Sequence, residues 1–496
     1  MIHLGPSGHS LLSDSEDSPT TRSSKARFGG KGIGLVASIA LTVNNISGAG
    51  MLEFPQMFQR SGILPSLLSL AFVCIVSTLF ATTLADTVAR IPGNKHFGIR
   101  IEFSDIFEQY IGRRIANLTQ AVFYLNLLSQ NIAAIVACAQ MFDSFAGSFW
   151  PGVTYALRVS PSPWDWIRWD PSHCKSGSGN CVPFASETEG ALIISMGYLV
   201  TLLLFAPLGL LTLEENMLQQ KFSFVALFVL SGQFVYAFLS TGLDAGSLPW
   251  IGNHWADALG VVIFNFAFCV TVPSWLNEKA PDVSVNRVFW TSTLTSTLLY
   301  TCVGILGALA FPHVPENMLS VLLSQQVDFT TRFCATLFGV VIIGFGIPIF
   351  SVIMRYNLVN SGLCSEPLAH VWSSVVPWLS AWTLYQGSVT LKLLSWSGLV
   401  LNGFIDFLMP GLVTIISLGA AKRALHCWGR QSLDVEETPS LTQAMPSSPI
   451  APFPDWLRPY YREVVTAMLA FLLVLLPLCL WLQMYCSGSK ACYPVV

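Results

Sequence analysis

The sequence predicts an all-α integral membrane protein with about 11 transmembrane helices, of which the first and the sixth are discontinuous. Of the 496 residues, 53% are hydrophobic and only 11% are charged, less than half the charged share of about 25% that is usual in soluble domains. Long apolar runs recur along the chain, and each approaches the roughly 20 residues that cross a hydrocarbon core. The first and the sixth of these runs carry helix-breaking residues, glycine or proline, near their middle. Together these three observations predict the fold class.

The apolar runs define eleven predicted spans that alternate between the two sides of the membrane. They are residues 33–57, 63–90, 116–142, 190–212, 222–241, 257–277, 288–311, 331–355, 371–388, 392–420 and 460–485. Lys and Arg concentrate in the loops that lie inside if the N-terminus is cytosolic. The positive-inside rule therefore predicts a cytosolic N-terminus and an extracytosolic C-terminus.

The same pattern predicts the organisation of the chain. Residues 1–32 are polar and rich in serine, which predicts a disordered cytosolic tail and no cleaved signal peptide. Residues 33–486 form one transmembrane domain, with an extracytosolic loop at 143–189 and a cytosolic loop at 421–459. Residues 487–496 form an extracytosolic C-terminal tail. A basic block that could track nucleic-acid phosphates is missing from the sequence, so no nucleic-acid partner is expected.

Four of the twelve cysteines fall in predicted extracytosolic segments, where disulfides persist. Cys174 and Cys181 bracket one short loop, and Cys486 and Cys492 bracket another. Each pair is a candidate disulfide, and free thiols are the alternative, since sequence spacing does not give the distance between Cα atoms.

The first span should be broken between Asn44 and Pro55. Gly48 and Gly50 are poor helix formers at mid-membrane depth, and Pro55 has no N–H to give to the carbonyl of Met51. The sixth span carries three β-branched residues before Pro273, which leaves the carbonyl of Cys269 without its helical donor. Hydrocarbon cannot satisfy free backbone groups, so something polar must do so at both places.

Glycine and proline are also common in ordinary membrane helices, where they cause kinks. Two interrupted spans at corresponding positions of the two halves, however, are the best sequence indication of a transporter binding site. The half-helices that follow the breaks offer N–H groups and positive dipole ends to an anion such as a substrate carboxylate.

The ordered motifs over most of the chain resemble those of the amino acid/auxin permease (AAAP) family, a branch of the amino acid–polyamine–organocation (APC) superfamily. They are Asn44 to Gly50 with Gly62, Phe264 to Phe268 with Pro273, Asn277 and Glu278, then Pro348 with Arg355, Pro377 with Trp378, and finally Trp396, Phe407 and Pro410. This resemblance implies a LeuT-like inverted repeat of five plus five helices with one extra helix. It also implies transport of small amino acids by alternating access.

The residues around the two breaks are the predicted substrate site. They are Asn44, Ser47, Gly48, Ala49, Gly50, Met51, Asn265, Phe268, Cys269 and Thr271. Sodium-coupled members of the family use an Asn that corresponds to Asn44 and a hydroxyl before the proline of the eighth span. Here the two positions that could carry that hydroxyl are Gly344 and Gly346, so the resemblance argues against sodium.

Proton coupling needs an ionisable side chain at depth, and all eight histidines fall outside the predicted spans. Asp406 in the tenth span and Glu53 after the first break are the candidates, because intramembrane acids are functional by default. A structural role is the alternative for each, for example a hydrogen bond between Asp406 and Asn402 one turn away.

Other classes of protein fit the sequence less well. It has no pattern of catalytic groups at depth, and neither a cofactor nor a metal is expected, so an enzyme is not predicted. A sodium-coupled transporter, an uncoupled transporter and an amino acid sensor with the same fold stay open. The membrane is predicted to be the plasma membrane or a vacuolar or lysosomal membrane.

Overall fold

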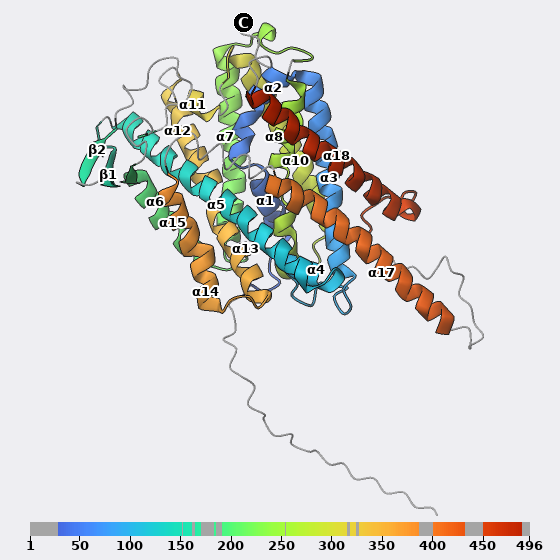
Figure 1. Cartoon of the computed structure of the whole chain (residues 1–496). Helices are drawn as coiled ribbons and strands as arrows, with labels where there is room; N and C mark the ends of the chain where they lie inside the picture. Colours follow the sequence, from blue (N-terminus) through green and yellow to red (C-terminus); the bar gives the residue numbers. More distant parts are fainter. Residues whose placement is uncertain are drawn as a thin grey trace, which may run out of the picture.

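The computed structural model is a helical bundle, and Figure 1 shows how its elements are arranged. The described residues are 28–150, 152–160, 164–169, 183–184, 191–252, 254–314, 318–323, 327–385, 400–431 and 450–488.

Eight helices of the described residues are long and apolar enough to cross a membrane. They are α3 (Ile63–Ala89), α5 (Arg113–Phe149), α7 (Met217–Thr241), Ala258–Glu278, α10 (Val285–Ala310), Phe329–Asn360, Val400–Ala420 and Arg458–Trp481. A ninth span is the pair Leu35–Ile46 and Gly50–Ser61, which is bent by 48°. A multi-pass helical membrane protein is thereby confirmed, whereas the count of eleven spans and the five-plus-five repeat stay predictions.

Several spans are divided into shorter helices. The first contains α1 (Leu35–Ile46), the 3-10 helix η1 (Ala49–Glu53) and α2 (Phe54–Ser61). The sixth contains α8 (Trp255–Asn265), η5 (Cys269–Thr271) and α9 (Val272–Glu278). The eighth contains α12 (Phe329–Leu337), the π-helical η6 (Phe338–Ile343) and α13 (Gly346–Asn360), and the tenth contains the π-helical η8 (Gly403–Leu408) and α17 (Met409–Gln431).

Two predicted spans correspond to shorter helices. The fourth contains α6 (Met196–Phe205) and η3 (Pro207–Leu210), and the ninth contains the π-helical η7 (Val371–Val375) and α15 (Val376–Thr383), which directly follow α14 (Glu366–His370). The remaining elements are α4 (Phe103–Tyr110), η4 (Ala245–Ser247), α11 (Leu319–Leu322), η10 (Arg458–Tyr460) and α18 (Tyr461–Gly488).

The first span lies at the centre of the bundle. Helix α1 packs against α7 and α10, while α10 also packs against α2 and α3. Helix α5 runs diagonally across the front of the bundle and packs against α6, α13 and α15 (Figure 1). The outer helices leave large apolar side chains exposed, for example Leu473 and Val474 on α18, as expected where lipid replaces water.

A glycine allows the sharp connection between α2 and α3. Gly62 has φ of 88°, and a Cβ there would lie 2.6 Å from the backbone nitrogen of Gly252. Only glycine combines this positive φ with so close a backbone approach. The link holds the C-terminal end of the first span against the segment that leads into α8.

A small antiparallel sheet is an element that the all-α prediction missed. Strand β1 (Tyr155–Ser160) pairs with β2 (Asp165–Arg168) and with β3 (Leu192–Ser195), so that Leu157 lies opposite both Trp166 and Ile194. Strands β1 and β2 belong to the predicted extracytosolic loop 143–189. The predicted domain boundaries otherwise stay predictions, and residues 28–32 of the predicted tail form hydrogen bonds to the bundle.

Candidate functional site

The break in the first span begins after Ile46. Ser47 (φ −87°, ψ 46°) and Gly48 (φ −77°, ψ −150°) leave the helical conformation before η1 begins. The Tyr300 hydroxyl donates a hydrogen bond of 2.6 Å to the carbonyl oxygen of Ile46. The Ser47 hydroxyl bonds to that of Ser296 at 3.1 Å. Helix α10 thus supplies the polar groups that the sequence required at this break.

The break in the sixth span lies between Asn265 and Cys269. The Ser77 hydroxyl donates to the carbonyl of Phe266 at 2.6 Å, and the Thr271 hydroxyl donates to that of Phe268 at 2.8 Å. The carbonyl of Cys269, which Pro273 was expected to leave free, accepts the N–H of Val272 instead. Pro273 lies in the first turn of α9, where its missing N–H has no helical partner to lose.

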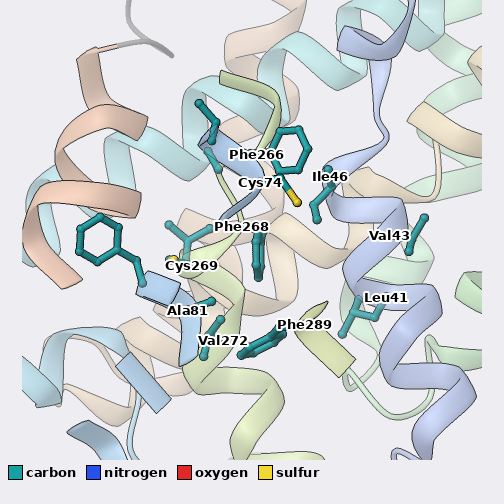
Figure 2. Close-up of a cluster of buried hydrophobic side chains, with 14 of the residues drawn as sticks. Leu41, Val43, Ile46, Cys74, Ala81, Phe266, Phe268, Cys269, Val272 and Phe289 are labelled. Atoms are coloured by element: carbon teal, nitrogen blue, oxygen red, sulfur yellow. The ribbon is translucent and has the colours of Figure 1, made fainter. Parts of the chain in front are cut away.

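The two breaks lie beside each other. The Asn45 amide donates to the Thr271 hydroxyl at 3.4 Å, and a Cβ on Gly50 would lie 1.9 Å from Oδ1 of Asn265. Figure 2 shows the apolar surroundings: Ile46 of α1 and Phe266 and Phe268 of the second break lie in one buried cluster. Phe54 stacks on Tyr300 with ring centroids 4.1 Å apart. The fold therefore brings residues of the two predicted breaks together.

Most of the predicted site residues are enclosed. Ser47, Met51 and Phe268 are 0% exposed, and Asn265 and Thr271 are 6% and 5% exposed. Asn44, Asn45 and Gly48 of the first break are partly exposed. Their role in binding substrate is a proposal that follows below.

Asp406 reaches the second break from η8. Its Oδ1 accepts a hydrogen bond from the backbone N–H of Val270 at 3.1 Å, while Oδ2 is buried without a hydrogen-bond partner among the described residues. The side chain is 0% exposed. Asn126, whose Nδ2 is also unpaired, interacts with Asp406 at longer range.

The predicted partner of Asp406 has another contact. Asn402 accepts a hydrogen bond from Gln130 at 2.7 Å, and Gln130 also lies 3.3 Å from Oδ1 of Asn126. The helical spacing correctly placed Asn126 and Gln130 on one face of α5. These hydrogen bonds connect α5 to Asn402, the residue before η8. Asn126 of this network interacts with the carboxylate of Asp406.

Glu53, the other candidate acid, lies on η1 and is half-buried. It is close enough to Tyr300 for their charges to interact. Asp406 is fully buried, so the two acids occupy different environments.

Asn44 is held by a residue that the sequence analysis did not select. Its Nδ2 donates to both the backbone carbonyl and the side-chain Oε1 of Gln220 on α7, at 2.8 and 2.9 Å. The Gln220 amide in turn donates to the carbonyl of Phe345 at 2.9 Å. Gln220 therefore bridges the first span to the eighth. Its partner in the eighth span, Phe345, lies between Gly344 and Gly346 in the sequence.

Two other candidate features have no structural description here. Cys174, Cys181 and Cys492 lie outside the described residues, and the same holds for the side chain of Cys486. In the part of the chain that is described, no three His, Cys, Asp or Glu side chains gather into a possible metal site.

The fold of the chain is that of known membrane transporters. One similar solved structure is MhsT in complex with L-phenylalanine, with a TM-score of 0.58 and 11% identity over 91% of this chain and 100% of that chain. Another is Mhp1, a nucleobase-cation-symport-1 family transporter in a closed conformation with bromovinylhydantoin bound, with a TM-score of 0.50 and 11% identity over 94% of this chain and 95% of that one. At this identity the likeness shows the fold alone, and it confirms the predicted LeuT-like class.

A family model matches part of the sequence. Residues 31–161 match the family model described as "Transmembrane amino acid transporter protein". This segment contains the first broken span, and the match confirms the predicted resemblance to amino acid transporters. No curated protein matches the chain. The fold is therefore that of known membrane transporters, and residues 31–161 resemble amino acid transporters.

Proposed function

We propose that the protein is a secondary active transporter that carries amino acids by alternating access and is driven by protons, with Asp406 as the coupling residue. The family match over residues 31–161 and the amino acid bound in the similar MhsT structure support the substrate class. We also propose the predicted orientation, with the N-terminus in the cytosol, and a plasma or vacuolar/lysosomal membrane.

The contact between Asp406 and Val270 carries this proposal. Oδ1 accepts the N–H of Val270, and the unpaired Oδ2 is the atom to which a proton can be added without breaking a hydrogen bond. Protonation neutralises the acceptor and weakens the bond to Val270, because hydrogen bonds to ionised groups are about twice as strong as neutral ones. A proton on Asp406 thus acts directly on the backbone that binds substrate.

The substrate lies, on this proposal, between the two breaks. The backbone of Ser47 to Met51 and of Phe268 to Thr271 would bind the charged ends of the amino acid, because N–H groups at half-helix ends attract a carboxylate. Asn265 and Thr271 are already in contact with the first span through Gly50 and Asn45. Glu53 remains a second candidate for the proton.

Gln220 favours protons over sodium. Its amide group donates to the Phe345 carbonyl, an oxygen that could otherwise bind a cation, and accepts from Nδ2 of Asn44, whose Oδ1 has no partner among the described residues. A hard cation needs several oxygen ligands, which lie at 2.3–2.6 Å in the case of Ca²⁺. An N–H donor cannot serve as one of these ligands. With Gly344 and Gly346 adding no side-chain oxygen, this position suits a hydrogen bond better than an ion.

Uptake by the purified protein in liposomes tests the proposal. Radiolabelled amino acids, with a nucleobase as a competing substrate class, are supplied with and without an inward proton gradient. We expect saturable amino acid uptake that the gradient increases several-fold, and loss of that increase in Asp406→Asn. Asp455→Asn, an exposed acid that is paired only with Arg458, is the matched control.

Each alternative gives its own result in this experiment. Binding without uptake would indicate a sensor, and uptake indifferent to the gradient would indicate an uncoupled or sodium-coupled transporter. Glu53→Gln separates the two acids, since loss of coupling in that variant alone would transfer the role to Glu53.

A further inference from the structure

A group of buried charges lies where α9, the N-terminal segment and the loop before α4 meet. We define residues 28–33 as the N-terminal strap. The N–H of Gly29 donates to Oε1 of Glu278 at 3.1 Å, and the N–H of Gly30 donates to Oε2 of Glu214 at 2.8 Å. Ile33 pairs with the backbone beside Lys279. The strap thus lies across the end of α9, the second half of the broken sixth span.

Arg100 is shared by two buried carboxylates. Its guanidinium lies 3.3 Å from Oε1 of Glu102 and 3.2 Å from Oε1 of Glu278, and both carboxylate side chains are 0% exposed. The same guanidinium lies over the rings of Phe28 and Tyr356, at 3.9 and 4.5 Å from their centroids. One positive charge therefore faces two buried acids and also holds the strap.

The hydrogen-bond partners of Glu278 and Glu102 differ in whether they can also accept a hydrogen bond. Glu278 accepts from the N–H groups of Gly29, Glu214 and Arg100, which can only donate. Glu102 accepts from the Ser274 hydroxyl at 2.6 Å and from the Asn277 amide at 2.9 Å. A hydroxyl can rotate and accept instead, so Ser274 can bond to Glu102 whether or not it carries a proton.

We propose that Glu102 is a second proton-binding site of the transporter, and that a proton bound there keeps the strap closed over α9. Glu102 connects the loop before α4 to α9 through Ser274 and Asn277, and it connects to the strap through Arg100. When the strap opens, water reaches the carboxylate and the proton leaves. The role of this site in transport rests on the proposed function, whereas proton binding at Glu102 does not.

The charge balance supports this linkage. The charged groups that act on Glu102 are Arg100 and Asp105 of its own segment, and Arg100 in turn faces Glu278 of α9, Lys31 of the strap and Tyr356 of α13. Burial raises the pKa of Glu102 from 4.5 to about 7, and Arg100 opposes this rise. Because a raised pKa favours the protonated form when the strap is closed, closure is favoured at low pH and weakens as pH rises from about 4.5 to about 7.

Hydrogen–deuterium exchange of the full-length protein in nanodiscs tests the proposal without requiring transport. The readout is exchange of the strap peptide that contains Gly29, Gly30 and Ile33, corrected for intrinsic rates, at several pH values from 5 to 8.5. We expect the opening equilibrium to rise up to about tenfold per pH unit below about pH 7 and to level off above it. In Glu102→Gln, whose amide is neutral, the strap should stay closed and show no pH dependence.

Two further variants sharpen the result. Glu108→Gln changes an exposed acid on the same helix α4 and should keep the wild-type pH profile. Glu102→Asp should keep a pH-dependent strap with a displaced midpoint. Faster exchange at every pH in Glu102→Gln, or a wild-type strap that does not respond to pH, would overturn the proposal. A pH-responsive strap in a chain that moves no amino acid would refute the transport proposal alone.

Discussion

The carboxylate of Asp406 accepts the backbone N–H of Val270 at 3.1 Å. Val270 belongs to the break of the sixth span and Asp406 to the π-helical start of the tenth. A side chain of the tenth span thus supplies a hydrogen-bond acceptor to the backbone of the sixth. Any change in the charge of Asp406 acts on this break directly.

Tyr300→Phe should destabilise the first break. The hydroxyl of Tyr300 is the donor to the Ile46 carbonyl in a fully buried position, and losing it leaves that carbonyl unpaired, at a cost of about 1–3 kcal/mol. Thermal unfolding in detergent should show a lower Tm. Tyr236→Phe, on an exposed side chain of α7, is the control and should leave the Tm unchanged.

Gly50→Ala should destabilise the protein much more than Gly48→Ala. A Cβ on Gly50 would lie 1.9 Å from Oδ1 of Asn265, whose amide bonds to the Val261 carbonyl, whereas a Cβ on Gly48 meets no atom within 4 Å. Asn265 must therefore move and lose that hydrogen bond, at about 1 kcal/mol or more. Equal unfolding temperatures for the two variants would contradict the close packing of the breaks.

Gln220→Leu should lower stability without introducing sodium dependence. The change removes the bridge between Asn44 and the Phe345 carbonyl and leaves buried polar groups unpaired, at about 1–3 kcal/mol each. Gln233→Leu on the same helix removes a single bond to Thr331 and should cost less. Wild-type uptake should be equal in sodium and choline media, and a several-fold loss in choline would restore the sodium alternative.

The sequence predicted the two breaks because glycine, proline and β-branched residues act locally on the backbone. It could not predict which side chains satisfy the open carbonyls, since Ser77 and Tyr300 come from other spans and look like ordinary polar residues in apolar runs. Asn402 shows the same limit. Its spacing suggested Asp406 as a partner, yet Gln130 of α5 reaches it instead.

Charges outside the spans were harder to interpret. Arg100 and Glu102 look like the solvated charges of a loop, and only the folded chain brings them beside Glu278, which follows some 176 residues later than Glu102. The strands β1 to β3 were missed because they are 4 to 6 residues long; β1 and β2 lie in a loop rich in aromatic residues, and β3 lies in an apolar run that was assigned to the fourth span. In each case the missing information was a long-range contact.

Proton movement during amino acid uptake tests the central claim most directly. A pH-sensitive dye trapped in proteoliposomes reports lumenal pH when an amino acid is added outside with no gradient imposed. We predict that the wild-type protein acidifies the lumen as the amino acid enters, and that Asp406→Asn takes up less amino acid and causes no acidification. Amino acid uptake without any lumenal pH change, or equal acidification by Asp406→Asn, would contradict the account.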